Sequence, residues 1–235
     1  MTSYLLYFIL FAGVILSGSA VLFLKINSKT LKLILSFSGA FLFAITILHL
    51  IPEIYIGSSA QIGIYILAGF LFQVFLDFFS EGIEHGHIHV HKHAETAFPL
   101  AVMLALSIHS FLEGMPLAGK WDEVKQSLLI GIILHNIPIA IALMSMLLQS
   151  NLPKSKAILW LLVFAMMTPM GAFANTFLAE NISIEGFTNK ITGIVIGIFL
   201  HISTTILFES GDEHRFNFVK FITILLGMAL AVIAI

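Results

Sequence analysis

The chain has 235 residues, of which 59% are hydrophobic and only 10% are charged. Soluble globular domains carry about 25% charged residues, so this composition excludes a water-soluble fold. The formal net charge of −2 provides no basic face for nucleic acid, and a sequence without cysteine excludes disulfides and thiolate metal sites. The ten histidines nearly equal the 11 lysines and arginines, and this imbalance is the first indication of a specific function.

Eight apolar segments predict eight transmembrane helices. A helix that crosses a bilayer needs about 20 apolar residues, so eight of them leave roughly 75 residues for the ends and seven short connections. We therefore expect an all-α membrane protein with a single transmembrane domain over residues 1–235. The first segment is interpreted as a true span, since Met1–Tyr4 lacks the basic residues of a signal peptide. The expected spans are 4–24, 32–52, 61–83, 97–119, 126–149, 156–179, 190–210 and 216–235.

Lysine and arginine favour one side of this expected bundle. Connections one, three, five and seven hold eight of them, whereas connections two, four and six hold three. Because these cations gather on the cytoplasmic side, both termini are expected outside. The eight are Lys25, Lys29, Lys32, Lys92, Lys154, Lys156, Arg215 and Lys220, and the three are Lys120, Lys125 and Lys190.

The third connection, residues 84–96, contains a run from His85 to His93 in which every second residue is histidine. Imidazole is a common ligand of borderline metals, so alternate histidines in a flexible segment predict loose metal binding. The alternative is a solvated polar loop without a ligand. The orientation above makes this segment a His-rich cytoplasmic loop.

Ionisable side chains inside the expected spans mark a candidate site, because burying them in a bilayer is costly. His109 and Glu113 are four residues apart in span four and therefore share one helix face. His135 lies in span five just before Pro138, and backbone carbonyls freed by a proline are tolerated where they line a cavity. Counted from the nearest outer lysine at about 1.5 Å per residue, His109, His135 and His201 of span seven all lie about 15–17 Å deep.

Three interpretations of these midmembrane residues stay open. Each histidine could simply hydrogen-bond a neighbouring helix, which is the favoured interpretation for His201 alone. A relay of protons without metal would use the same residue types. For His109, Glu113 and His135 together we favour a metal site, because neutral imidazoles and one carboxylate suit a tetrahedral or open zinc site.

Polar residues near the span ends outline a route for a cation. His49 and Glu53 are four apart at the outer end of span two. An acidic stripe ends span three and a second polar cluster ends span seven, although each set alone is more simply a group of helix-end charges. The stripe is Asp77, Glu81 and Glu84, and the cluster is Glu209, Asp212, Glu213 and His214.

Two motifs, His109-Ser-x-x-Glu113-Gly and His135-Asn-Ile-Pro138, resemble the paired signatures of the ZIP (Zrt/Irt-like) metal transporters. The resemblance extends along nearly the whole chain and includes the His-rich third loop. It implies an eight-transmembrane-helix bundle with inverted repeats and both termini outside. The similarity of Gly39-Ala-Phe-Leu42 to Gly197-Ile-Phe-Leu200 fits such repeats.

By this resemblance, His109, Glu113 and His135 fall on positions that bind the transported ion. Ser110 falls where the family commonly has asparagine, and Asn136 falls where it commonly has an acidic residue. Both are candidate metal-site residues. His201 is a candidate fourth ligand from its depth alone.

Two further positions depart from the family pattern. Ile139 stands where glutamate or histidine usually follows the proline, and Thr168 stands where glutamate often precedes one. With these positions neutral, two dications would share the single carboxylate of Glu113. We therefore expect one transported metal in the site.

The expected function is transport of divalent cations, most of all Zn²⁺, into the cytoplasm, and not enzymatic catalysis. The nitrogen-rich ligand set favours zinc, with Cd²⁺ or Fe²⁺ as alternatives. A non-transporting zinc sensor or inactive relative is the main alternative, and an intramembrane zinc hydrolase is a weaker one because no His-Glu-x-x-His motif is present. The expected partners are the metal ion, the lipid bilayer and a second copy in a homodimer, and the short loops suit a bacterial cytoplasmic membrane.

Overall fold

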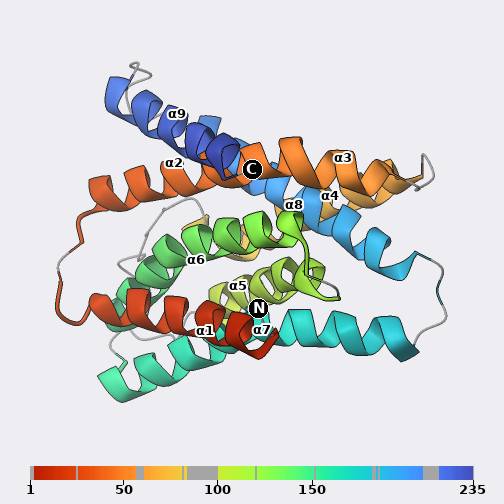
Figure 1. Ribbon diagram of the computed structural model, residues 1–235. Helices are drawn as coiled ribbons and strands as arrows, with labels where there is room; N and C mark the ends of the chain where they lie inside the picture. Colours follow the sequence, from red (N-terminus) through yellow and green to blue (C-terminus); the bar gives the residue numbers. More distant parts are fainter. Residues whose placement is uncertain are drawn as a thin grey trace.

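The computed structural model describes most of the chain. The described residues are 3–24, 26–56, 61–80, 82–83, 100–119, 121–150, 152–181, 184, 186–208 and 217–234. The secondary structure of this part is helical, without a strand (Figure 1). This confirms the all-α prediction.

Every one of the eight predicted spans has a helical counterpart. Two of these counterparts are interrupted helices, since α2 continues through a π-helical turn into α3, and α5 ends in a 3₁₀ turn. In chain order the elements are α1 (Ser3–Ala20), α2 (Ser28–Ile45), the π-helical turn (Thr46–Leu50), α3 (Ile51–Tyr55), α4 (Ile62–Ser80), α5 (Leu100–Gly114), the 3₁₀ turn (Met115–Leu117), α6 (Glu123–Gln149), α7 (Lys154–Asn181), α8 (Phe187–Phe208) and α9 (Phe218–Ile233).

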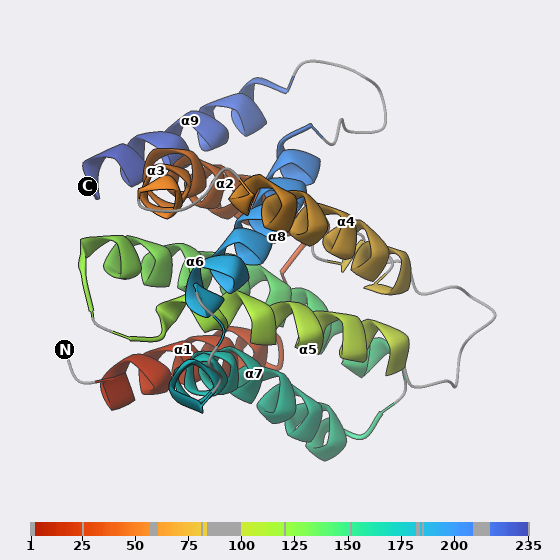
Figure 2. The same cartoon turned by 90° about the vertical axis from the view of Figure 1, so that its right-hand side faces the viewer.

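Six helical segments of the described chain are long and apolar enough to cross a membrane. The other two, Leu5–Ala20 in α1 and Phe218–Ile233 in α9, are apolar but shorter. The structure thus supports an integral membrane protein with six candidate spans, while the count of eight stays a prediction. Helix α1 begins and α9 ends at the same end of the bundle (Figure 2), as an even number of spans would require.

The helices form two groups (Figure 2). Helices α1, α5, α6 and α7 form one group, in which α5 packs on α7 and α1 packs on α6 and α7. Helices α2, α3, α4, α8 and α9 form the other, in which α4 packs on α8 and α2 packs on α9. We call these the α6 group and the α8 group. They meet chiefly where α2 contacts α6 and α4 contacts α5.

Side-chain caps fix the beginnings of three helices. Asn27, Asp122 and Asn217 each accept a hydrogen bond from the backbone N–H three residues later, at 2.7, 2.8 and 3.0 Å. Such caps satisfy backbone donors that lack a partner within the helix. They set where α2, α6 and α9 begin.

Glycines allow two pairs of helices to touch backbone to backbone. A Cβ atom added to Gly69 of α4 would lie 1.9 Å from the Ile194 oxygen, and one added to Gly197 of α8 would lie 1.9 Å from the Ile66 oxygen. Helices α5 and α7 also touch backbone to backbone, at Gly114 of α5 and Gly171 of α7. Small residues at interfaces are typical of helices that pack within a bilayer.

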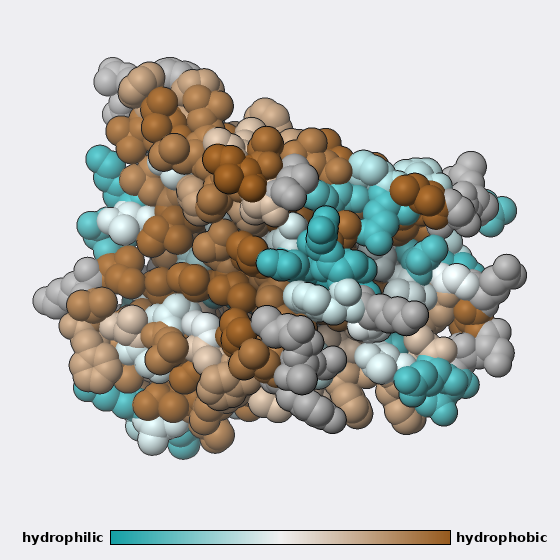
Figure 3. All heavy atoms as spheres, in the orientation of Figure 1, coloured by the Kyte–Doolittle hydropathy of each residue, from teal (hydrophilic) through white to brown (hydrophobic). Residues whose placement is uncertain are grey.

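Apolar side chains cover much of the outer surface. Figure 3 shows them across the left and middle of one face, with hydrophilic side chains gathered mainly on the right. Helix α4 alone exposes Leu71, Phe75 and Phe78, each by more than half of its surface. Lipid tails would cover such a surface, in agreement with the hydropathy of the sequence.

Candidate metal site

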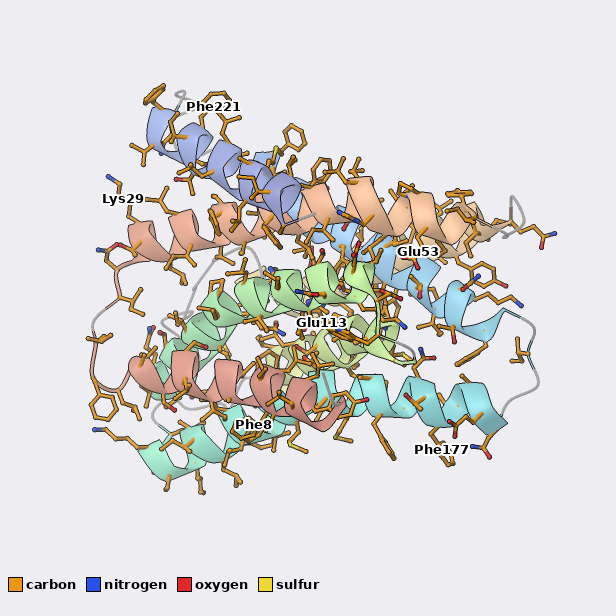
Figure 4. The ribbon with its side chains drawn as sticks, in the orientation of Figure 1. Phe8, Lys29, Glu53, Glu113, Phe177 and Phe221 are labelled. Carbon is orange, nitrogen blue, oxygen red and sulfur yellow. The ribbon has the colours of Figure 1, made fainter. Side chains whose placement is uncertain are left out.

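The core of the candidate site is a histidine and a glutamate on α5. His109 and Glu113 are fully buried, one helical turn apart. The His109 Nε2 atom lies 3.6 Å from the Glu113 Oε2 atom. The predicted common face of these two residues is therefore present, and Figure 4 shows Glu113 in the interior, between Lys29 and Glu53 near opposite ends of the molecule.

The second motif reaches the same place from α6. His135 is fully buried, and its ring meets the ring of His109 edge to face, with the centroids 6.0 Å apart. The interior proline of α6, Pro138, lies within one turn of His135. The structure thus brings together the two motifs that the sequence separates by about 25 residues.

Glu113 is held by three hydrogen bonds to one of its two oxygens. Its Oε1 atom accepts from Ser110 Oγ at 3.3 Å, from Asn136 Nδ2 at 2.6 Å and from Thr168 Oγ1 at 3.1 Å. Its Oε2 atom has no hydrogen-bond partner among the described residues and faces His109. A buried carboxylate needs such donors, because the bilayer interior offers no water to replace them.

Ser110 and Asn136, which the sequence analysis proposed as metal-site residues, therefore lie beside Glu113. Both are buried, and both contact its carboxylate as hydrogen-bond donors. The Oδ1 atom of Asn136 is buried and has no hydrogen-bond partner in the described part of the chain. Thr168, predicted only as a neutral residue at a position where the family often has glutamate, is a third hydrogen-bond donor to Glu113. Ile139, the other neutral position, is fully buried.

His201 has a different neighbourhood. Its Nε2 atom lies 2.5 Å from Asp77 Oδ2 of α4, and its ring packs edge to face on Phe70 with centroids 5.0 Å apart. The buried Gln73 donates to the other Asp77 oxygen at 3.0 Å. Depth along a helix does not reveal the side to which a residue points, so the sequence could not identify this pairing.

The described residues include no group of three or more histidine, cysteine, aspartate or glutamate side chains placed to hold a metal ion. His109, Glu113 and His135 are neighbours in pairs, and His201 does not complete a set with them. Simultaneous coordination would require these side chains to draw closer together.

The predicted outer pair of the cation route lies at one end of the interrupted helix α2–α3. His49 belongs to the π-helical turn, and Glu53 is exposed, within electrostatic range of His49, Asp122 and Lys125. Asp77 of the predicted acidic stripe is the partner of His201. The other route residues fall outside the described part of the chain. These are Glu81, Glu84, the His-rich loop 84–96, Glu209, Asp212, Glu213 and His214.

Replacing Asp77 with asparagine is expected to weaken the contact between α4 and α8. The change keeps an oxygen for Gln73 but removes the charge opposite His201, and polar contacts between membrane helices are worth about 0.6–2 kcal/mol. Thermal unfolding in detergent of the two single variants and the double variant with His201→Ala measures the coupling. Effects that simply add would contradict the pairing.

The amino-acid sequence of the chain is similar to a known protein family and to several known proteins. Residues 84–234 match the profile of the family described as ZIP Zinc transporter. The chain is 29% identical over 175 residues to Protein zntD of Dictyostelium discoideum, covering 66% of this chain and 25% of that protein. It is 30% identical over 127 residues to Zinc transporter ZIP1 of Danio rerio (52% and 42%), and 28% identical over 159 residues to Zinc transporter ZIP9 of Micropogonias undulatus (62% and 50%). The chain therefore spans half or less of the length of these relatives.

Proposed function

Because residues 84–234 match its profile, the chain belongs to the ZIP zinc transporter family, and we propose that it carries divalent cations, zinc above all, across the membrane into the cytoplasm. The family consists of transporters and not of enzymes, and the curated relatives reported above include proteins named as zinc transporters. These names support zinc as the transported substrate. Cd²⁺ and Fe²⁺ are the alternative cargoes.

The observation that supports this proposal most is the spacing of the buried ligand atoms. Zinc binds imidazole nitrogen and carboxylate oxygen at about 2.0–2.2 Å, so two ligands of one tetrahedral ion are about 3.4 Å apart. The 3.6 Å between His109 Nε2 and Glu113 Oε2 agrees with a shared ion. Two imidazoles on one such ion have centroids about 5 Å apart, so the 6.0 Å between His109 and His135 calls for a small closure of the rings around the ion.

We expect one ion in this site at a time. Among the described residues, Glu113 is the only carboxylate of its hydrogen-bond network, whose other members are the neutral Ser110, Asn136 and Thr168. Two dications at this place would repel each other with one negative charge between them, and the low local dielectric would strengthen the repulsion.

The site residues suggest which part of the protein moves. His109, Glu113, His135 and Thr168 all lie on helices of the α6 group, while Asp77 and His201 lie in the α8 group. Movement of one group against the other would expose the ion first to one side and then to the other. In this proposal the chain forms a single domain of eight spans and two inverted repeats, both termini lie outside, and the loop 84–96 receives the ion in the cytoplasm.

The deciding experiment measures zinc entry into proteoliposomes that hold the purified protein and an internal zinc-sensitive dye. Saturable entry that vanishes in Glu113→Ala is the expected result, because that change removes the carboxylate of the site. Normal entry through Glu113→Ala would contradict the site. Bound zinc without entry through the wild-type protein would contradict transport and favour a zinc sensor instead.

A further inference from the structure

The two oxygens of the Glu113 carboxylate have different hydrogen-bond environments. All three of its hydrogen-bond donors, from Ser110, Asn136 and Thr168, meet at Oε1. They come from three helices, α5, α6 and α7. Three donors fill the acceptor capacity of one carboxylate oxygen, so Oε2 is the oxygen left for another partner.

Thr168 is held in place by the backbone contact of α5 and α7. A Cβ atom on Gly114 would lie 2.0 Å from the Thr168 oxygen, and one on Gly171 would lie 1.8 Å from the Phe111 oxygen. The two backbones are therefore too close at this point for a side chain at either glycine. This close approach brings the short threonine side chain within 3.1 Å of Glu113.

Asn136 and Thr168 also support each other. The Asn136 Nδ2 group donates to Glu113 Oε1 at 2.6 Å and lies 3.4 Å from Thr168 Oγ1. Thr168 can therefore accept from Asn136 while its own hydroxyl proton points to Glu113. This orients the amide nitrogen of Asn136 away from an ion and leaves its Oδ1 atom, which has no partner in the described chain, as the atom able to face one.

We propose that Thr168, together with Asn136 and Ser110, is a positioning residue that makes Glu113 bind the transported ion through Oε2 alone. The inference rests on the proposed function and adds a mode of coordination to it. A carboxylate that uses one oxygen suits the four-coordinate zinc ion. A carboxylate that uses both oxygens suits larger ions with more ligands, such as cadmium.

The test compares Thr168→Val with Thr168→Ser. Valine keeps the β-branched shape but removes the hydroxyl donor, whereas serine keeps the donor. Difference infrared spectra recorded on adding zinc report the separation of the two carboxylate stretching bands, which is wide for binding through one oxygen and narrow for binding through two. Glu113→Gln identifies the bands that belong to this residue.

Wide separation in the wild type and in Thr168→Ser, with a narrower one in Thr168→Val, is the expected result. In proteoliposomes, the ratio of zinc to cadmium uptake should fall about tenfold in Thr168→Val, as expected for the loss of one hydrogen bond to a charged group. Equal band separations and equal ratios in all three proteins would overturn the positioning role. A wild type in which zinc changes no Glu113 band would instead overturn the proposed site.

Discussion

Replacing His135 with alanine is expected to abolish zinc uptake and zinc binding at the midmembrane site. The change removes one of the two imidazoles in a cluster of buried side chains whose only described carboxylate is Glu113. Loss of a residue that only supports a metal ligand lowers metal affinity or activity by about 10- to 100-fold. Loss of a ligand itself should therefore lower uptake by more than about 100-fold. Dye-reported flux and zinc titration of the purified protein measure the two effects.

A buried residue of the same helix provides the matched control for this prediction. Ile132 is fully buried in α6, so Ile132→Ala leaves a cavity but removes no nitrogen ligand. Both variants should lose thermal stability, whereas only His135→Ala should lose zinc. A variant without the histidines from His85 to His93 should bind less zinc in total yet retain flux. Normal transport by His135→Ala would show that the site is misassigned.

The sequence predicts the helices and the shared face of His109 and Glu113 well, and particular residues show why. Hydropathy alone locates a helix of the described chain for each predicted span, because a bilayer requires long apolar runs. The four-residue spacing of His109 and Glu113 determines their common face whatever the neighbouring helices do. Their approach to His135 depends on side-chain contacts between α5 and α6, the His109–His135 ring pair and the Glu113–Asn136 hydrogen bond. The shared depth and the family resemblance of the two motifs were its only signals in the sequence.

The hydrogen-bond partners of His201 and Thr168 could not be predicted from the sequence. The equal depth of His201 suggested a common site, yet the orientation of α8 turns its ring to Asp77. A threonine within a helix commonly bonds to the carbonyl four residues earlier, as Thr46, Thr176 and Thr192 do here. The family resemblance distinguishes Thr168 only as a position that lacks a carboxylate, and its hydrogen bond to Glu113 depends on the close contact of α5 and α7, which the sequence does not reveal.

Gly171→Ala is expected to impair both stability and transport, although alanine is the better helix former. The added Cβ atom would lie 1.8 Å from the backbone oxygen of Phe111, which cannot turn away as a flexible side chain can. Overpacking of this kind costs about 1–3 kcal/mol, which should lower the unfolding temperature in detergent. Separating α7 from α5 would also draw Thr168 away from Glu113, so uptake should fall in protein that is still folded.

Gly13 of α1 is the matched control, because an alanine there meets no backbone atom of another helix. The nearest atom to an added Cβ belongs to the Ile133 side chain, at 3.8 Å, an ordinary van der Waals distance. Gly13→Ala should therefore keep transport and raise stability by up to about 1 kcal/mol, because the helix gains propensity without a clash. If Gly171→Ala unfolds at the same temperature as Gly13→Ala and transports zinc as well, the backbone contact of α5 and α7 does not hold the site together. If only Gly171→Ala loses uptake, the positions of Thr168 and Glu113 depend on that contact.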